Sequence, residues 1–221
     1  MTATGRAGWA RGRSGSARAI RSTLAALVVV AATGIAVSML VAEGDVWALP
    51  TLSHLSADAT AGRPFRVTML VVGVLGLALA AQVVRLLGRM RTEGLIGPRW
   101  ARLYRLAFRV VPVGFLGVAV FPLGVAPFVE LAHGTAAYAI PIAVLVLMLT
   151  ARLAIPGLGA AFGRASLLVI VVVLLLYVAA VGAAVSFAVM EAIAFGIGAA
   201  WFVVFVEALV RLDPSAERGT H

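Results

Sequence analysis

Six long apolar stretches, separated by short polar segments, dominate this sequence. They cover about 24–42, 65–87, 106–121, 135–149, 166–189 and 191–210. A helix needs about 20 mainly apolar residues to cross the hydrocarbon core of a bilayer, and it satisfies its own backbone hydrogen bonds there. The pattern therefore predicts an all-α membrane protein, folded as a bundle of six transmembrane helices.

The composition agrees with a chain whose solvent is lipid. Hydrophobic residues make up 62% of the 221 residues and charged residues 12%, whereas soluble domains average about 45–50% and about 25%. The chain has no cysteine. This excludes disulfides, thiolate catalysis, cysteine-ligated zinc and iron–sulfur clusters.

The chain divides into three parts. We expect 1–22, which is rich in Gly, Ser, Ala and Arg, to be a disordered basic tail, 23–211 to form the six-helix transmembrane domain, and 212–221 to be a cytoplasmic tail. A basic start before an apolar run resembles a secretory signal. However, the apolar region of a signal peptide spans about 7–15 residues. The longer run at 24–42 predicts an uncleaved first helix.

Arginine indicates how the bundle is oriented. With six spans both termini lie on one side, and that side receives sixteen of the 18 arginines, leaving only Arg63 and Arg66 opposite. Arginine-rich short loops stay in the cytoplasm. We therefore expect a multi-pass protein of the cell membrane (plasma or inner), with both termini and most arginine-rich loops cytoplasmic. The net charge of +9 then reflects topology and attraction to membrane lipid, and nucleic-acid binding is not expected.

Small residues at four-residue spacing predict where helices approach one another. In lipid, apolar burial does not drive helices together, so close backbone contact at small residues must do so. The last run carries Ala192, Gly196 and Ala200, and the second carries Gly76 and Ala80.

Most of the groups able to do chemistry lie at the predicted outer face. His54 and Asp58 are four residues apart, so on a short helix they share one face, and Glu130 and His133 are three apart. If the two segments meet, their imidazoles and carboxylates suit a divalent metal such as zinc, or acid–base work. The alternative is that water merely solvates them. The candidate outer-face polar cluster comprises Ser53, His54, Ser56, Asp58, Glu130, His133 and Glu191.

Within this cluster, the candidate metal ligands are His54, Asp58, Glu130 and His133. We assign no catalytic residue and expect no cofactor, with zinc as the alternative. Glu207 is the carboxylate placed well within a span, and Arg211 follows one turn later. An unpaired buried charge is costly in a membrane. We therefore interpret these two as a structural ion pair, with a proton or ion relay as the alternative.

The order of short motifs resembles a known family. Leu-Ser-His-Leu-Ser precedes the second span, Phe121-Pro122 ends the third, His133-Gly134 opens the fourth and Glu191 opens the sixth. This pattern resembles the bacterial integral membrane family labelled domain of unknown function 998. That family is distantly similar to the damage-regulated autophagy modulators and the Sfk-type membrane proteins.

The resemblance covers about 24–211 and implies a six-helix bundle without an established reaction. It also implies that Ser53, Ser56, His133 and Glu191 are the outer-face polar positions of the family. An arginine is expected just after the acid that opens the sixth span, but Ala192 stands there.

Three functions fit the sequence. A non-catalytic lipid-interacting or accessory membrane protein, with other membrane proteins as candidate partners, needs only the bundle, and we rank it first. A metal-dependent membrane hydrolase would need the outer His, Asp and Glu side chains to converge. A small-molecule or proton-coupled transporter subunit would need polar residues along the middle of its helices, where the sequence offers few.

Overall fold

The computed structural model describes residues 3–213, with side chains from residue 16 onward. The helices are α1 (Ala3–Val41), α2 (Gly62–Thr92), α3 (Pro98–Val120), α4 (Pro127–Ala154), α5 (Gly159–Val181) and α6 (Phe187–Arg211), with short 3-10 helices η1 (Val46–Ala48), η2 (Leu52–Ser56) and η3 (Pro156–Leu158). All regular secondary structure in this range is helical, and six helices are long and apolar enough to cross a membrane. The predicted fold class is confirmed.

The helix bounds differ from the apolar runs. α1 begins at Ala3, so most of the segment for which we expected disorder is helical, and 214–221 lie outside the described residues. α3 and α4 begin at Pro98 and Pro127, well before the expected spans 106–121 and 135–149. Proline suits the first position of a helix because its missing N–H has no partner there anyway. Glu130 and His133, which precede the apolar run at 135–149, therefore lie in the first two turns of α4.

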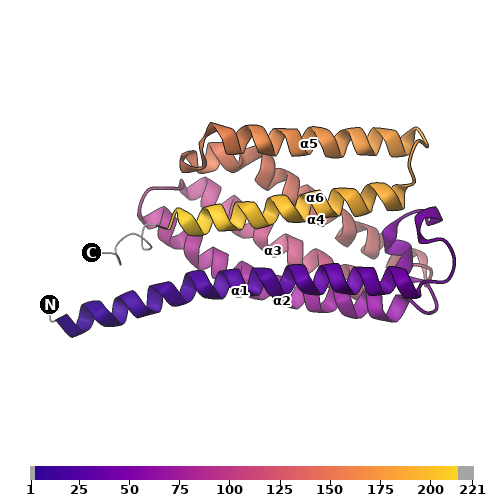
Figure 1. Ribbon diagram of the computed structural model, residues 1–221, viewed down its shortest axis with the longest axis horizontal. Helices are drawn as coiled ribbons and strands as arrows, with labels where there is room; N and C mark the ends of the chain where they lie inside the picture. Colours follow the sequence, from indigo (N-terminus) through magenta and orange to yellow (C-terminus); the bar gives the residue numbers. More distant parts are fainter. Residues whose placement is uncertain (1–2, 214–221) are drawn as a thin grey trace.

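Helices that follow one another in the sequence lie side by side, and α6 returns to contact α1 and α2. Figure 1 shows the resulting bundle, with α5 on its outside and the two ends of the chain at the same end. α5 has only two buried residues among its described positions, Ser166 and Ala180. We call the end that holds the termini, the α2–α3 turn and the α4–α5 turn the arginine-rich end.

Close helix contacts are made at glycines. A Cβ on Gly76 of α2 would lie 2.8 Å from Cβ of Pro112 in α3, and one on Gly114 of α3 would lie 2.8 Å from the carbonyl oxygen of Ala136 in α4. The prediction for Gly76 and Ala80 is confirmed, since Ala80 is also buried. The prediction for α6 is wrong, because a Cβ on Gly196 would meet nothing within 4 Å. This stripe faces outward from the bundle.

The α2–α3 turn is closed by a glycine in the left-handed region. Gly94 has φ +75°, its N–H donates to the carbonyl of Arg91, and the N–H of Leu95 donates to that of Met90. These two bonds form a Schellman motif, which satisfies carbonyls left free at a helix end. The motif fixes the last turn of α2 beside the first turns of α3.

Two apolar clusters hold the bundle together. The larger one lies toward the arginine-rich end and is built around aromatic rings. There Phe205 of α6 stacks on Trp201 with ring centroids 4.9 Å apart and contacts Tyr104 and Phe108 of α3. The smaller cluster lies at the opposite end and includes Leu55, which is fully buried between the start of α2 and its neighbours.

Candidate functional site: a polar plug at one end of the bundle

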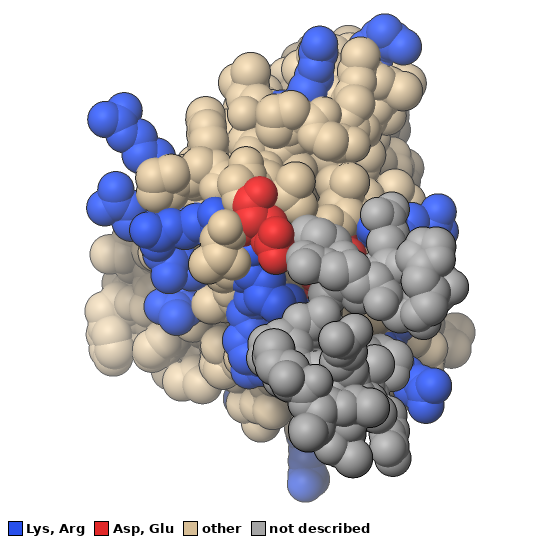
Figure 2. Space-filling view, turned by 90° about the vertical axis from the view of Figure 1, so that its left-hand side faces the viewer, with Lys and Arg blue, Asp and Glu red and all other residues tan. Residues whose placement is uncertain are grey.

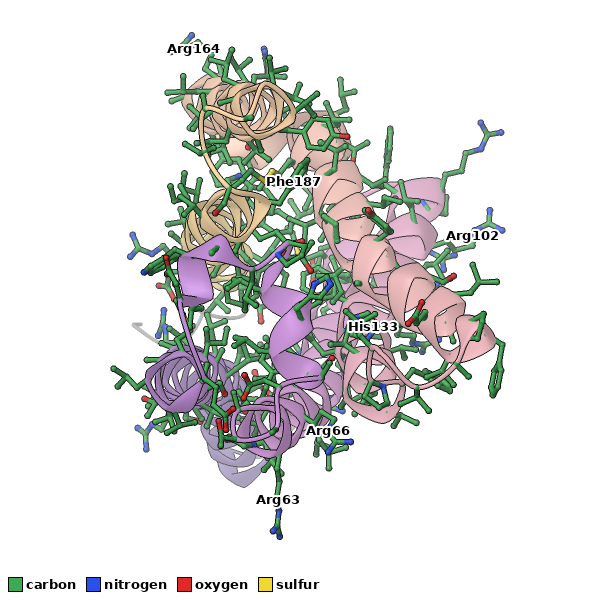
Figure 3. The ribbon with its side chains drawn as sticks, turned by 90° about the vertical axis from the view of Figure 1, so that its right-hand side faces the viewer. Arg63, Arg66, Arg102, His133, Arg164 and Phe187 are labelled. Carbon is green, nitrogen blue, oxygen red and sulfur yellow. The ribbon has the colours of Figure 1, made fainter. Side chains whose placement is uncertain are left out.

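The segment between α1 and α2, residues 43–61, folds back over the end of the bundle that is opposite the arginine-rich end. We call it the plug. It contains η1 and η2, which contact α6, and η2 also contacts α2. Figure 3 looks onto this end and shows the plug lying across it, with His133 beside it. Leu55 anchors the plug because its side chain enters the apolar cluster beneath.

Asp58 organises the end of the plug and the entry into α2. Its carboxylate accepts hydrogen bonds from three backbone N–H groups, those of Ala61 at 2.7 Å, Thr60 at 2.9 Å and Glu43 at 3.2 Å. These bonds, led by that from Ala61, lower the pKa of Asp58 below its usual value, and desolvation opposes them. Asp58 therefore acts as an ionised cap that joins the two ends of the plug.

Ser56 and Glu130 hold the α3–α4 turn. The hydroxyl oxygen of Ser56 accepts from the N–H of Leu123 at 3.2 Å, and a carboxylate oxygen of Glu130 accepts from the N–H of Gly124 at 3.2 Å. Ser56 is buried, whereas Glu130 is exposed. Both side chains therefore bind backbone of the same turn, one from the plug and one from α4.

His133 is buried under the plug, with 2% of its surface exposed. Its Nδ1 is hydrogen-bonded to the carbonyl oxygen of Phe121, so Nδ1 carries the proton and donates. Nε2 is buried and has no partner among the described residues. His54 lies within electrostatic range of this ring, while its own Nδ1 is 2.8 Å from the hydroxyl of Thr51.

Glu191 joins the plug to α6. One of its carboxylate oxygens accepts from the N–H of Leu52, the first residue of η2, at 2.7 Å. Ser53, in the same turn, is half-buried. The resemblance placed Ser53, Ser56, His133 and Glu191 together at one face, and the structure brings all four to the plug end.

The proposed metal ligands do not form one set. Asp58 is bound to backbone within the plug, Glu130 to the α3–α4 turn and His133 to Phe121. In the described part of the chain, no three His, Cys, Asp or Glu side chains are grouped closely enough to hold a metal ion. The shared helical face expected for His54 and Asp58 is also absent, because η2 ends at Ser56.

At the arginine-rich end, Glu207 joins two helices. Its carboxylate accepts from Arg21 of α1 at 2.8 and 2.9 Å and from Arg211 of α6 at 3.0 Å. Arg89 of α2 pairs with Asp213 at 2.7 Å. The structure therefore contains the Glu207–Arg211 pair proposed from the sequence, together with a partner from α1.

Sequence reasoning missed Arg21 and Asp213 as structural partners. Arg21 is 186 residues from Glu207, and Arg89 is 124 residues from Asp213. Helical spacing reports neighbours three or four residues away, so it identified only Arg211. The available signal was topological: each of these residues lies near the arginine-rich end of its membrane-spanning segment, and six alternating spans bring these ends to the same side.

Figure 2 looks onto the arginine-rich end. Arginine side chains lie all around this face, and few acidic side chains are in view. The arginines that the helix order places toward this end are Arg18, Arg21, Arg85, Arg89, Arg91, Arg99, Arg102, Arg105, Arg152, Arg164 and Arg211. Ion pairs in the described range use Arg21, Arg89 and Arg211. Most of these arginines therefore form no ion pair with a carboxylate of the described residues.

No family model matches this chain, and neither a curated protein nor a solved structure does. The resemblance to the bacterial family labelled domain of unknown function 998 stays a prediction.

Proposed function

We propose that this protein is a non-catalytic, lipid-interacting accessory protein of the cell membrane, with both termini and the arginine-rich end in the cytoplasm. The observation that carries the proposal is the concentration of arginine at one end of a bundle of six apolar helices (Figure 2). Positively charged segments stay on the cytoplasmic side, where anionic headgroups attract them.

The hydrogen bonds of the plug support a structural role for the end of the bundle that it covers. Asp58, Ser56, Glu130 and Glu191 each accept a hydrogen bond from a backbone N–H group, and these bonds hold the plug and the α3–α4 turn in place. A carboxylate engaged in this way has fewer lone pairs free for a metal or a substrate. We therefore favour closure of the bundle over hydrolysis as the task of these residues.

The lipid part of the proposal is tested by extracting the protein with its surrounding lipid in polymer-bounded discs. Mass spectrometry then compares the lipid classes in the discs with those of the whole membrane. We expect anionic phospholipid to be enriched around the protein. A disc composition equal to that of the bulk membrane would contradict the proposal.

The non-catalytic part is tested by metal analysis of the purified protein. We expect no zinc that depends on the plug-end histidines. Zinc at close to one ion per chain, lost in both His54→Ala and His133→Ala, would instead establish a metal site and favour the hydrolase.

A further inference from the structure

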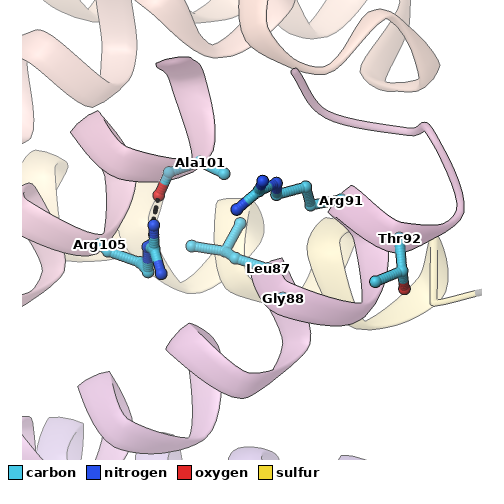
Figure 4. Close-up of a pocket in the computed structure, with 6 residues that line it drawn as sticks. All are labelled: Leu87, Gly88, Arg91, Thr92, Ala101 and Arg105. Atoms are coloured by element: carbon cyan, nitrogen blue, oxygen red, sulfur yellow. Dashed lines mark hydrogen bonds between the residues drawn. The ribbon is translucent and has the colours of Figure 1, made fainter. Parts of the chain in front are cut away.

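A partly open cavity lies at the arginine-rich end, between the last turns of α2 and the first turns of α3. Its volume is about 490 Å³. The residues that line it are Leu87, Gly88, Arg91, Thr92, Ala101 and Arg105. Figure 4 shows the side chains of Arg91 and Arg105 lying on either side of Leu87.

Among the described residues, no carboxylate pairs with either arginine of the cavity. Arg105 donates from Nε to the carbonyl oxygen of Ala101, and the other N–H groups of its guanidinium make no hydrogen bond to a described residue. The ion pairs formed within residues 16–213 involve Arg21, Arg89 and Arg211, and none reaches Arg91 or Arg105. Two guanidinium groups beside one cavity suit a phosphate group, because their N–H groups match its oxygens in geometry and charge.

The walls of the cavity and its position indicate which phosphate compound fits. Leu87 and Ala101 are buried apolar residues, so part of the lining is hydrocarbon. On the adjoining face of α3, Leu106 and Val113 are 60% and 56% exposed, and they are seven residues apart along the membrane-spanning part of the helix. A molecule with a phosphate in the cavity and acyl chains along this face would satisfy both surfaces.

Gly88 keeps the cavity open. A Cβ at this position would meet nothing within 4 Å, although Gly88 lies inside α2, where glycine is less favourable than other residues. A larger side chain here has room to extend into the cavity without displacing a helix.

We propose that this cavity binds the phosphodiester headgroup of an anionic phospholipid of the cytoplasmic leaflet, held between Arg91 and Arg105. This site rests on the proposed function, since it requires the arginine-rich end to face an anionic leaflet.

The experiment measures lipid binding to the full chain in detergent by native mass spectrometry, with phosphatidylglycerol as the probe and phosphatidylcholine as the zwitterionic control. We expect wild type to retain phosphatidylglycerol preferentially. The double variant Arg91→Gln/Arg105→Gln should lose about tenfold or more in affinity, because it removes two sets of charge-assisted hydrogen bonds. The matched variant Arg152→Gln/Arg164→Gln removes the same charge from the same end, away from the cavity, and should bind as wild type does.

Gly88→Leu separates occupation of the cavity from loss of charge. It keeps every arginine, and we expect it to weaken phosphatidylglycerol binding by a similar factor without lowering the thermal stability. Equal weakening in both arginine double variants, or unchanged binding in Gly88→Leu, would overturn the site.

Two further measurements complete the test. One distinguishes a lipid headgroup from free phosphate, and the other distinguishes failure of the cavity site from failure of the proposed function. Inorganic phosphate alone should not displace the lipid; displacement at millimolar concentrations would assign the cavity to a free phosphate and overturn the lipid site. If wild-type discs are enriched in anionic lipid and the cavity variants are equally enriched, the site fails and the proposed function stands. If wild type shows no enrichment, the proposed function fails as well.

Discussion

At the scale of single residues, the polar side chains of the plug serve the backbone. Asp58 shows this most clearly, because its carboxylate collects the N–H groups of Glu43, Thr60 and Ala61. Buried or partly buried N–H groups that lose their acceptor cost free energy. The side chain therefore stabilises a loop that closes one end of the bundle.

We expect Asp58→Ala to lower the free energy of unfolding by about 1–2 kcal/mol, because three backbone N–H groups lose a charged acceptor. Thermal unfolding in detergent measures the change. Glu43→Ala is the matched control, since it removes an exposed carboxylate whose residue contributes its backbone N–H to Asp58. A loss as large in the control would contradict the capping role.

The same residue gives the stability a pH dependence. Its folded pKa is lowered, so its contribution is complete above the unfolded value, about 3.9, and disappears as the pH falls through the lower folded value. The stability difference between wild type and Asp58→Ala should be constant above pH 5 or so and should shrink below about pH 4. A difference that grows on acidification would contradict this assignment.

Ala183, in the α5–α6 turn, adopts a conformation that favours glycine. Its φ is +56°, and a left-handed conformation costs a non-glycine residue roughly 1–2 kcal/mol. We expect Ala183→Gly to raise the free energy of unfolding by about 0.5–1 kcal/mol. Thermal unfolding again measures the effect. Ala184→Gly is the control, and it should give no such gain.

The sequence predicted the positions of the polar residues better than it predicted their roles. The sequence located these polar residues at one end correctly. Hydropathy locates the spans, and successive loops between spans alternate between the two ends of the bundle. The spacing of His54 and Asp58 suggested metal ligands, but the same residue types also cap helices and turns. The donors that decide between these roles are backbone groups such as those of Leu52 and Leu123, which carry no signature in the sequence.

At the scale of helices, small residues determine which faces meet. Gly76 admits Pro112, and Gly114 admits the backbone of Ala136. Helices in lipid gain most from such close approach. The outward stripe on α6 shows that four-residue spacing of small residues is not sufficient to make a packing face within the bundle.

We expect Gly114→Ala to destabilise the protein by about 1–3 kcal/mol, because the added methyl group would lie too close to backbone and force α3 and α4 apart. Gly196→Ala is the matched control, since its methyl group meets open space. The control should be neutral or slightly stabilising, given the higher helix propensity of alanine. Thermal unfolding of the two variants in the same detergent makes the comparison. Equal losses would contradict the assigned contacts.

The existence and number of the helices followed from hydropathy alone, whereas their bounds and partners did not. α3 and α4 extend past their apolar runs because Pro98 and Pro127 open them within polar sequence. The outer position of α5 and the return of α6 to α1 depend on contacts between residues far apart in the chain. The Arg21–Glu207 pair is one of these contacts.

At the scale of the whole molecule, the two ends differ in the sign of the charge that they carry. Arginines gather at the end that carries the termini, and the plug end carries Glu43, Asp45, Asp58, Glu130 and Glu191. The lipid-binding proposal and the cavity site both require the arginine-rich end to face the cytoplasm. Orientation is therefore the central claim of this account.

Single-cysteine labelling tests that orientation most directly, because the natural chain has no cysteine. Val125 in the α3–α4 turn and Leu95 in the α2–α3 turn are 65% and 38% exposed, at opposite ends of the bundle. With a membrane-impermeant maleimide, we expect Val125→Cys to be labelled in intact cells and Leu95→Cys only after permeabilisation. Labelling of Leu95→Cys in intact cells, with Val125→Cys protected, would contradict the account.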